Sequence, residues 1–150
     1  MIESPKPGSL SAATFVDVFV EGWALPKPDA FLEYFRPHIH PDAAFEQPVF
    51  RTGHGPDGFE RVFNQLFVQI PDLVLTVANS AWGGEVVFIE SRCQGTLGGH
   101  PIELEVCDRF TLADGRIIER RSYSDPLPSL LATAKRPRTW GRAVRSLRTQ

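Results

Sequence analysis

The stretch VVFIESRCQGTLGGHPIELEVCDRFTLADGRIIERRSYS, residues 86–124, decides the fold, because two tight turns within it fix the register of three strands. Gly98-Gly99 is a two-residue hairpin signal, since glycine adopts a positive φ at no steric cost. Ala113-Asp114-Gly115 marks the second turn. The turns predict strands over 86–97, 102–112 and 116–124 that pair in an antiparallel meander.

The two turns also predict which side chains meet. Pairing Leu97 with His100 places Ile89 opposite Asp108, and pairing Leu112 with Arg116 places Asp108 opposite Arg120 and Val106 opposite Ser122. Because side chains alternate along a strand, one face gathers mostly apolar residues: Val87, Ile89, Ser91, Cys93, Leu104, Val106, Asp108, Phe110, Ile118, Arg120 and Ser122. The other face carries exposed ion pairs, Arg92 with Glu105 and Arg109 with Glu119. An aspartate opposite an arginine on an apolar face makes that face the candidate functional surface.

The composition sets the broad class of the protein. A chain of 150 residues fits one domain, and a net charge of −2 argues against a general nucleic-acid binder. Cys93 and Cys107 fall on opposite faces of the predicted sheet, so we expect free thiols. No apolar stretch approaches the length of a signal core or a membrane span. We therefore expect a cytoplasmic protein without a membrane or nucleic-acid partner.

The rest of the chain predicts helices around the sheet. Residues 1–10 read as a disordered lead, and Ser9 or Ser11 caps a helix with an apolar stripe that ends before Pro26. Further helices are predicted over 29–36 and 57–70, with strands over 43–47 and 73–77, a loop over 38–42, irregular structure over 52–56 and a helical turn over 127–134. The resulting fold class is α+β: a curved antiparallel sheet wrapped around helices, forming a conical cavity that suits a small molecule.

The chain divides into the lead (1–10), the domain (11–134) and a basic tail (135–150). Every ionisable side chain of the tail is basic, and Trp140, Val144 and Leu147 recur at helical spacing. One interpretation is an arm that binds a membrane surface or a nucleic acid. We favour the other, a helical tail that packs on its own domain or on a partner subunit.

The element order and several short motifs resemble a known family. The motifs are AFEQP (44–48), FVQIPDL (67–73), CDRF (107–110), DGRIIE (114–119) and YSDPLP (123–128). Over residues 12–131 the chain resembles the nuclear transport factor 2-like (cystatin-like) superfamily and, within it, the SnoaL-like proteins. The resemblance implies the conical fold and pairing of subunits through the outer sheet face as a homodimer. It leaves the activity open, because the fold hosts isomerases, cyclases, epoxide hydrolases and non-catalytic binders.

The activities of three related enzyme groups do not transfer intact. Asp108 matches the aspartate that ketosteroid isomerases keep protonated as a hydrogen-bond donor. Their general base falls at Gln47, which cannot accept a proton, and their tyrosine donor falls at Phe19. The catalytic aspartate of polyketide cyclases and limonene-epoxide-type hydrolases falls at Ser122. The tyrosine and asparagine with which the hydrolases hold water fall at Phe45 and Gln47, of which only Gln47 can hold a water.

The Asp108–Arg120 pair has two interpretations of equal weight. It is a buried ion pair that only specifies the sheet, or it is an acid/base held ionised by the arginine. In the second interpretation Gln47 and Ser122 position substrate or water, and the apolar walls come from Phe19, Tyr34, Phe45, Ile89, Val106 and Phe110. His38, His40 and His54 match no tight ligand motif, so we expect no metal and no cofactor.

Three functions follow as hypotheses. The first is a cofactor-independent SnoaL-like enzyme of the isomerase, cyclase or hydrolase type, acting on a small apolar molecule through Asp108 and Arg120. The second is a non-catalytic domain that binds a small hydrophobic ligand, favoured by the missing carboxylates at Gln47 and Ser122. The third is a protein-interaction domain that uses the basic tail.

Overall fold

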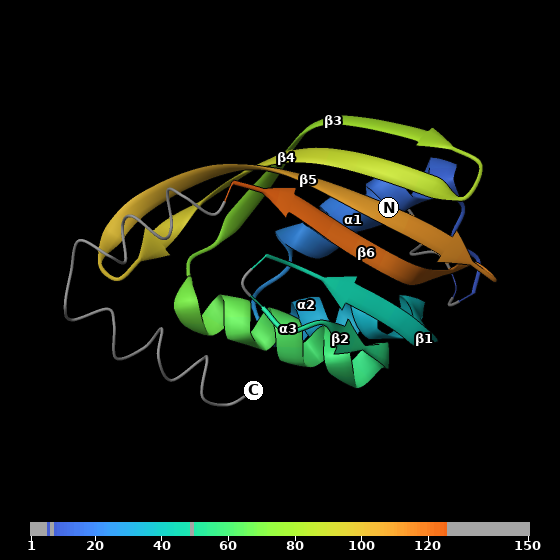
Figure 1. Cartoon of the computed structure of the whole chain (residues 1–150), viewed down its shortest axis with the longest axis horizontal. Coiled ribbons are helices and arrows are strands. Elements are labelled where there is room, and N and C mark those ends of the chain that lie inside the picture. The colour runs from blue at the N-terminus through green and yellow to red at the C-terminus, as the bar shows by residue number, and fades with distance from the viewer. Residues whose placement is uncertain (1–5, 7, 49, 126–150) are drawn as a thin grey trace.

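The computed structural model describes residues 6, 8–48 and 50–125, which form one curved sheet with helices packed against it (Figure 1). The sheet order is β2-β1-β6-β5-β4-β3. Along the chain the elements are α1 (Ala12–Ala24), α2 (Asp29–Phe35), the 3₁₀ turn η1 (Arg36–His38), β1 (Ile39–Glu46), β2 (Gly53–His54), α3 (Gly55–Gln69), β3 (Val74–Gly83), β4 (Val86–Leu97), β5 (His100–Ala113) and β6 (Arg116–Ser124). The α+β prediction is confirmed.

The sheet differs from the prediction in being mixed. β3 to β6 form the expected antiparallel meander, but β1 pairs parallel with β6 and antiparallel with the unexpected short strand β2. β1 starts at Ile39, inside the predicted loop, and ends at Glu46, so Gln47 lies just beyond the strand. The parallel neighbour explains the longer strand, since β6 pairs with it at Ile39 and, after an irregularity, again from Ala44 to Glu46.

Local sequence accounts for the helices. Ser11 and Thr14 form a capping box at the start of α1, each side chain bonding to the backbone N–H of the other. In α3, Phe59, Phe63 and Phe67 recur every fourth residue and are all buried, so one face of the helix meets the sheet. The helix begins at Gly55, before the predicted Asp57, with Pro56 in its first turn where proline is tolerated.

The first hairpin has the predicted register, with Leu97 opposite His100 and Ile89 opposite Asp108. The predicted register of the second hairpin is wrong: Asp108 faces Ser122, and Val106 faces Ser124.

Two local features shift the second hairpin. Asp114 (φ 52°) and Gly115 (φ 65°) form a two-residue turn that joins Ala113 to Arg116, in place of the predicted three-residue turn. A bulge then inserts Ile118 opposite the step from Thr111 to Leu112. Ile117 therefore faces the core in place of Ile118.

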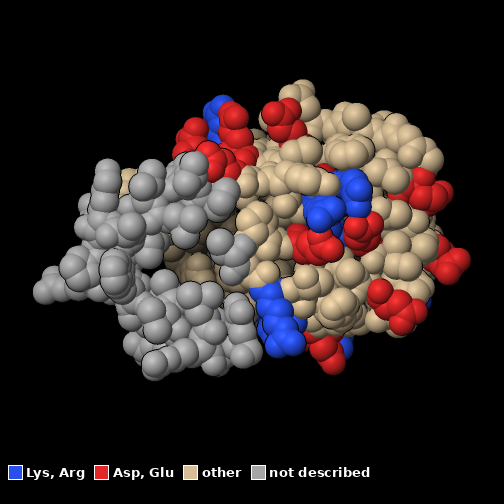
Figure 2. All heavy atoms as spheres, viewed as in Figure 1, with Lys and Arg blue, Asp and Glu red and all other residues tan. Residues whose placement is uncertain are grey.

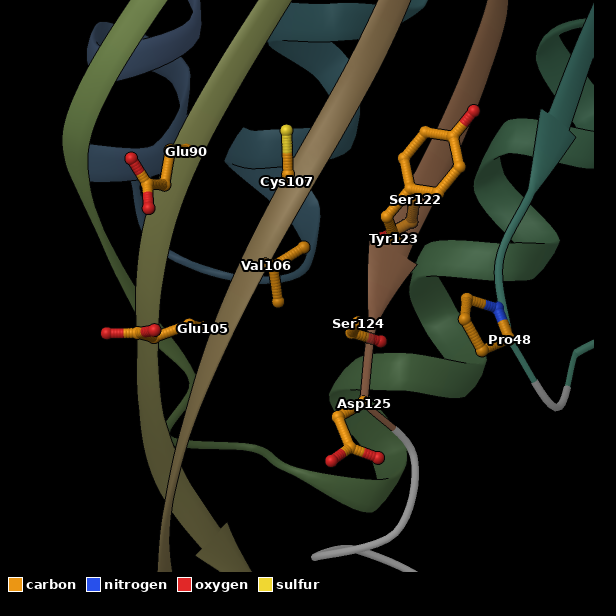
Figure 3. A pocket seen from close by; sticks show the side chains of 9 residues that line it. All are labelled: Pro48, Glu90, Glu105, Val106, Cys107, Ser122, Tyr123, Ser124 and Asp125. Atoms are coloured by element: carbon orange, nitrogen blue, oxygen red, sulfur yellow. The ribbon is translucent and has the colours of Figure 1, made fainter.

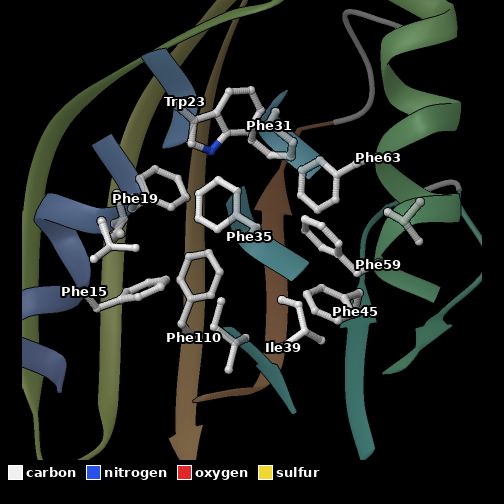
Figure 4. Close-up of a cluster of buried hydrophobic side chains, with 14 of the residues drawn as sticks. Phe15, Phe19, Trp23, Phe31, Phe35, Ile39, Phe45, Phe59, Phe63 and Phe110 are labelled. Atoms are coloured by element: carbon white, nitrogen blue, oxygen red, sulfur yellow. The ribbon is translucent and has the colours of Figure 1, made fainter. Parts of the chain in front are cut away.

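Aromatic side chains fill the concave side of the sheet (Figure 4). Ring centroids lie about 5–6 Å apart along a continuous cluster contributed by all three helices, β1 and β5. The cluster consists of Phe15, Phe19, Trp23, Phe31, Phe35, Phe45, Phe59, Phe63, Phe67 and Phe110. Gly22 lets α1 approach α2 closely, because a Cβ there would collide with the Phe35 ring. A small space of about 20 Å³ lies among these rings, much smaller than a cavity that could hold a small molecule.

Part of the predicted lead packs on the domain. Leu10 is buried, and its N–H donates to the Gly115 carbonyl at 3.1 Å. The predicted helical turn over 127–134 and the basic tail lie outside the described residues.

The outer face of the sheet carries ion pairs and several exposed aromatic side chains. Arg109 pairs with Glu119 as predicted, at 2.5 Å, although the two residues are diagonal neighbours rather than directly opposite. Arg92 faces Glu105 but pairs with Glu103, at 3.5 Å. Among the residues that the structure describes, no helix is long and apolar enough to cross a membrane.

Candidate functional site

Three polar side chains form a row across the inner face of the sheet. Asp108 on β5 lies directly opposite Ser122 on β6. β1 pairs Phe45 with Arg120 and Glu46 with Arg121, so the continued register places Gln47 beside Ser122 on the other side. Phe45 points into the core, and alternation points Gln47 the same way. The row therefore consists of Gln47, just past the end of β1, Ser122 on β6 and Asp108 on β5.

Arg120 ties the two ends of this row together. One of its terminal nitrogens, Nη2, donates to both carboxylate oxygens of Asp108 at 3.1 Å, and Nη1 donates to Gln47 Oε1 at 2.9 Å. The guanidinium carbon lies 5.1 Å from the centroid of the Phe63 ring, within the range of a cation–π contact. The sequence predicted that Asp108 and Arg120 meet, and they do, as diagonal neighbours.

Burial makes this ion pair costly to form. Asp108 is 1% exposed and Arg120 is 5% exposed, so both charges lose most of their hydration on folding. A buried ion pair seldom stabilises a fold more than apolar side chains of similar size would, although removing one partner is strongly destabilising. The pair holds both side chains in one fixed geometry, which is what an acid/base site requires.

Two buried residues of β4, on the same face of the sheet as the row, had no assigned role in the sequence. Ser91, on the predicted inner face of β4, is buried, and its hydroxyl finds no hydrogen-bond partner in the described part of the chain. Burial raises the pKa of the Cys93 thiol to about 12, with the Asp108 charge adding to the effect and Arg120 opposing it. The raised pKa disfavours the thiolate form of Cys93, which is the nucleophilic form of a cysteine.

The predicted lining residues separate into two groups. Phe19, Phe45 and Phe110 line the small internal space together with Arg120, and Ile89 is buried directly opposite Asp108. Tyr34 lies elsewhere: its hydroxyl donates to Glu21 at 2.7 Å and its ring packs on Phe35, so it lines neither of the two spaces described here.

A larger hollow of about 440 Å³ lies beside the middle of β5 and the last residues of β6 (Figure 3). It includes the predicted residues Val106 and Ser122 but neither Asp108 nor Arg120. Its other lining residues are Pro48, Glu90, Glu105, Cys107, Tyr123, Ser124 and Asp125. Burial, Asp108 and Glu90 together raise the pKa of Cys107, which disfavours the reactive thiolate. Both cysteines are free, as predicted.

The histidines and surface charges point to no further site. His38 and His40 lie at the start of β1, at the opposite end of the strand from Gln47. Within residues 6, 8–48 and 50–125, no group of three metal-type side chains comes together. On the face shown in Figure 2, acidic and basic side chains of the described residues are interspersed and form no broad basic patch.

Comparison with known proteins places this geometry in context. Residues 16–120 match the sequence profile of the SnoaL-like domain. A candidate SnoaL-like polyketide cyclase from Jannaschia sp. CCS1 superposes with a TM-score of 0.73 at 23% identity, covering 90% of this chain and 99% of that one. Wild-type IdmH, a candidate polyketide cyclase from Streptomyces antibioticus, gives 0.64 at 23% identity, with 80% and 96% covered. An LEH-like epoxide hydrolase of M. tuberculosis gives 0.61 at 21% identity, with 77% and 84% covered. No curated protein sequence gives a match.

Proposed function

The chain belongs to the SnoaL-like domain family, and from that premise we propose that it is a cofactor-independent enzyme acting on a small apolar molecule. The observation that carries the proposal is the buried Asp108–Arg120 pair on the inner face of the sheet. This ion pair costs hydration, and Gln47 binds its arginine at a second point. The fold alone does not require such a pair, because apolar side chains could fill the same position.

The residues of the row take distinct roles in this proposal. Asp108 is the acid/base that moves a proton at the reacting carbon or oxygen, and Arg120 orients its carboxylate. Gln47 and Ser122 position the substrate or a water molecule. The reaction is of the isomerase, cyclase or hydrolase type, and each of these types needs one well-placed proton transfer.

The substrate must reach the row from the side where polar groups remain accessible. The internal space of about 20 Å³ holds no more than a water molecule, so the apolar body of a substrate does not fit among the aromatic rings as they stand. Gln47 is only half-buried, and Ser122 also lines the larger hollow. We therefore place the reacting end of the substrate beside these two residues.

Proton exchange tests the proposal without knowledge of the natural substrate. 1-Tetralone dissolved in D₂O exchanges its α-protons slowly, and the exchange is followed by proton NMR with and without the protein. Cyclohexene oxide, followed for hydrolysis, covers the other reaction type. We expect acceleration by the native protein, its loss in Asp108→Asn, and no change in the matched control Asp17→Asn, at an exposed aspartate of α1. Equal rates for native protein and Asp108→Asn on both probes would refute the catalytic role.

The second candidate function is a non-catalytic domain that binds small hydrophobic ligands. It is favoured by the glutamine and serine that stand where related enzymes carry a carboxylate or its equivalent. In this case 1-tetralone binds with unchanged affinity in Asp108→Asn, and neither probe reacts.

The proposal extends to assembly and location. Phe88 and Tyr123 are 44% and 47% exposed on the outer face, and the charged residues near them are already paired within the chain, as Arg109 is with Glu119. We propose a homodimer formed through this face, detectable as a dimer mass by native mass spectrometry. Two free cysteines suit a reducing compartment, which favours the cytoplasm.

A further inference from the structure

The hollow of about 440 Å³ beside β5 and β6 offers apolar surface to a docking segment (Figure 3). Val106 and Cys107 are half-buried among its lining residues, and Tyr123 is 47% exposed. A volume of this size is typical of pockets that hold drug-sized organic groups. The hollow can therefore receive a large aromatic side chain.

Two glutamates of the hollow carry charges that the described part of the chain does not neutralise. Glu90 and Glu105 are exposed, and neither forms an ion pair with a described residue. Glu90 accepts a hydrogen bond from the neutral amide of Asn79. Arg92 lies opposite Glu105 but pairs with Glu103. A cation that enters the hollow thus meets unneutralised carboxylates beside apolar surface.

The C-terminal tail, residues 135–150, has the complementary composition. It contains six of the 16 basic side chains and none of the 18 acidic ones, so the rest of the chain is strongly acidic. Trp140, Val144 and Leu147 recur within it at helical spacing. Opposite charges steer two surfaces together and fix their register, whereas a buried aromatic side chain carries much of the binding energy. The tail therefore carries the cationic and apolar groups that the hollow lacks.

The described domain also ends at the hollow itself. Asp125, the last described residue, is one of the residues that line the hollow. Residues 126–134 separate it from the tail, and nine residues reach at most about 30 Å when extended. A segment tethered by so short a linker has an effective concentration in the millimolar range at a neighbouring site. Weak contacts are therefore enough for docking within one chain.

We propose that the hollow is the docking site of the chain's own C-terminal tail, with Trp140 on the apolar surface and the basic side chains beside Glu90 and Glu105. The docking itself does not depend on the proposed activity. Ser122 lines the same hollow, and the substrate is proposed to approach beside it. A docked tail therefore covers this approach and must leave before a substrate binds.

Cys107 serves as a reporter of docking, because it lines the hollow and is more accessible than Cys93. Iodoacetamide labels the full chain at pH 8, and mass spectrometry of its peptides gives the rate at Cys107. A tail that occupies the hollow nine-tenths of the time slows this labelling about tenfold. We therefore expect a rate about tenfold higher in Trp140→Ala, in which the tail loses its aromatic anchor without a change in charge.

Charge reversal in the tail tests the electrostatic part of the docking. Arg142→Glu with Arg145→Glu should also raise the rate at Cys107, although the loss of positive charge alone would disfavour the thiolate and slow the reaction. Lys6→Glu with Arg61→Glu makes the same change of charge at exposed residues outside the hollow and should keep the native rate. Circular dichroism at 25 °C checks that all variants are folded.

Zero-length crosslinking tests the contact directly. Arg138→Lys with Arg142→Lys keeps the charge of the tail and places an amine on each side of Trp140. A carbodiimide then joins amines to carboxylates that touch them. We expect links from these lysines to Glu90 or Glu105 in the monomer band of a denaturing gel. Links confined to the dimer band would overturn docking within one chain.

The outcomes separate this inference from the proposed function, which has its own proton-exchange assay. Equal labelling of Cys107 in the native protein and in Trp140→Ala, with no link to either glutamate, would overturn the docking and leave the proposed function standing. Binding of the native protein to vesicles of phosphatidylserine and phosphatidylcholine, with equal labelling of Cys107 in both proteins, would overturn it too and assign the tail to an anionic membrane surface.

Discussion

Replacing Arg120 with methionine should destabilise the protein by about 3–5 kcal/mol at pH 7. The methionine fills much of the space of the arginine stem but leaves Asp108, 1% exposed, with no partner for its charge. The carboxylate must then be buried unpaired or take up a proton on folding, and either event costs free energy. Gln47 also loses the Arg120 donor to its carbonyl oxygen, a smaller effect because Gln47 is half-buried.

A double-mutant cycle isolates the ion pair from the change in packing. Asp108→Leu alone leaves the arginine charge buried, whereas Asp108→Leu with Arg120→Met removes both charges. Because replacing a whole buried pair by apolar side chains is often neutral or stabilising, we expect the double variant to recover most of the loss. Urea unfolding at 25 °C, followed by circular dichroism, gives the free energy of unfolding of each variant. In thermal unfolding, Arg120→Met alone should lower Tm by about 10 °C. A loss below about 1 kcal/mol in Arg120→Met would refute the reasoning.

Three further predictions follow from other buried groups. Burial and the neighbouring charge of Arg116 lower the pKa of His38 in the folded protein. The unfolded chain therefore protonates His38 more readily than the folded one. The contribution of neutral His38 to stability is complete above pH 6.5, the ordinary pKa, and is lost as the pH falls below it. Urea midpoints between pH 7.5 and 5 should therefore fall less steeply in His38→Gln, and parallel slopes would contradict this. Iodoacetamide at pH 8 should modify Cys107 slowly and spare Cys93 until the protein unfolds, because burial raises the pKa of Cys93 to about 12; mass spectrometry that finds both labelled at one rate would argue against it. Phe31→Ala should cost about 3–5 kcal/mol, since the ring is 1% exposed and packs against Trp23, Phe35 and Phe63 with centroids 4.9, 4.8 and 5.1 Å away; the cavity should bind benzene, and an unchanged Tm would show that the neighbouring rings close the gap.

The sequence was most informative where structure depends on neighbouring residues. The Gly98-Gly99 turn, the helical spacing of phenylalanines and the prolines that end helices all act locally, and the first hairpin register and most elements agreed with the structure. The second hairpin was misread because Asp114-Gly115 is itself a complete two-residue turn. The bulge at Ile118 has no signature that a simple alternation pattern reveals.

The candidate site was predictable in part. Asp108 and Arg120 were expected to meet as directly opposite residues, and they meet because a long arginine side chain reaches its diagonal neighbour. The position of Gln47 beside Ser122 depends on the parallel pairing of β1 with β6, a contact between distant parts of the chain. The closely filled interior depends on how aromatic rings from three helices and two strands fit together, which periodicity does not specify.

The parallel pairing of β1 with β6 has a consequence for how the protein is made. During synthesis β1 emerges early, whereas its parallel partner β6 is the last strand described. The edges of β1 and β5 that pair with β6 therefore stay unpaired until β6 has been synthesised. Arg120 belongs to β6, so Asp108 lacks its arginine partner until β6 has paired with β5. Contacts between segments so far apart in sequence form slowly. The site is therefore completed only once β6 has paired, and a nascent chain halted before residue 116 contains every helix that the structure describes but lacks the arginine that pairs with Asp108.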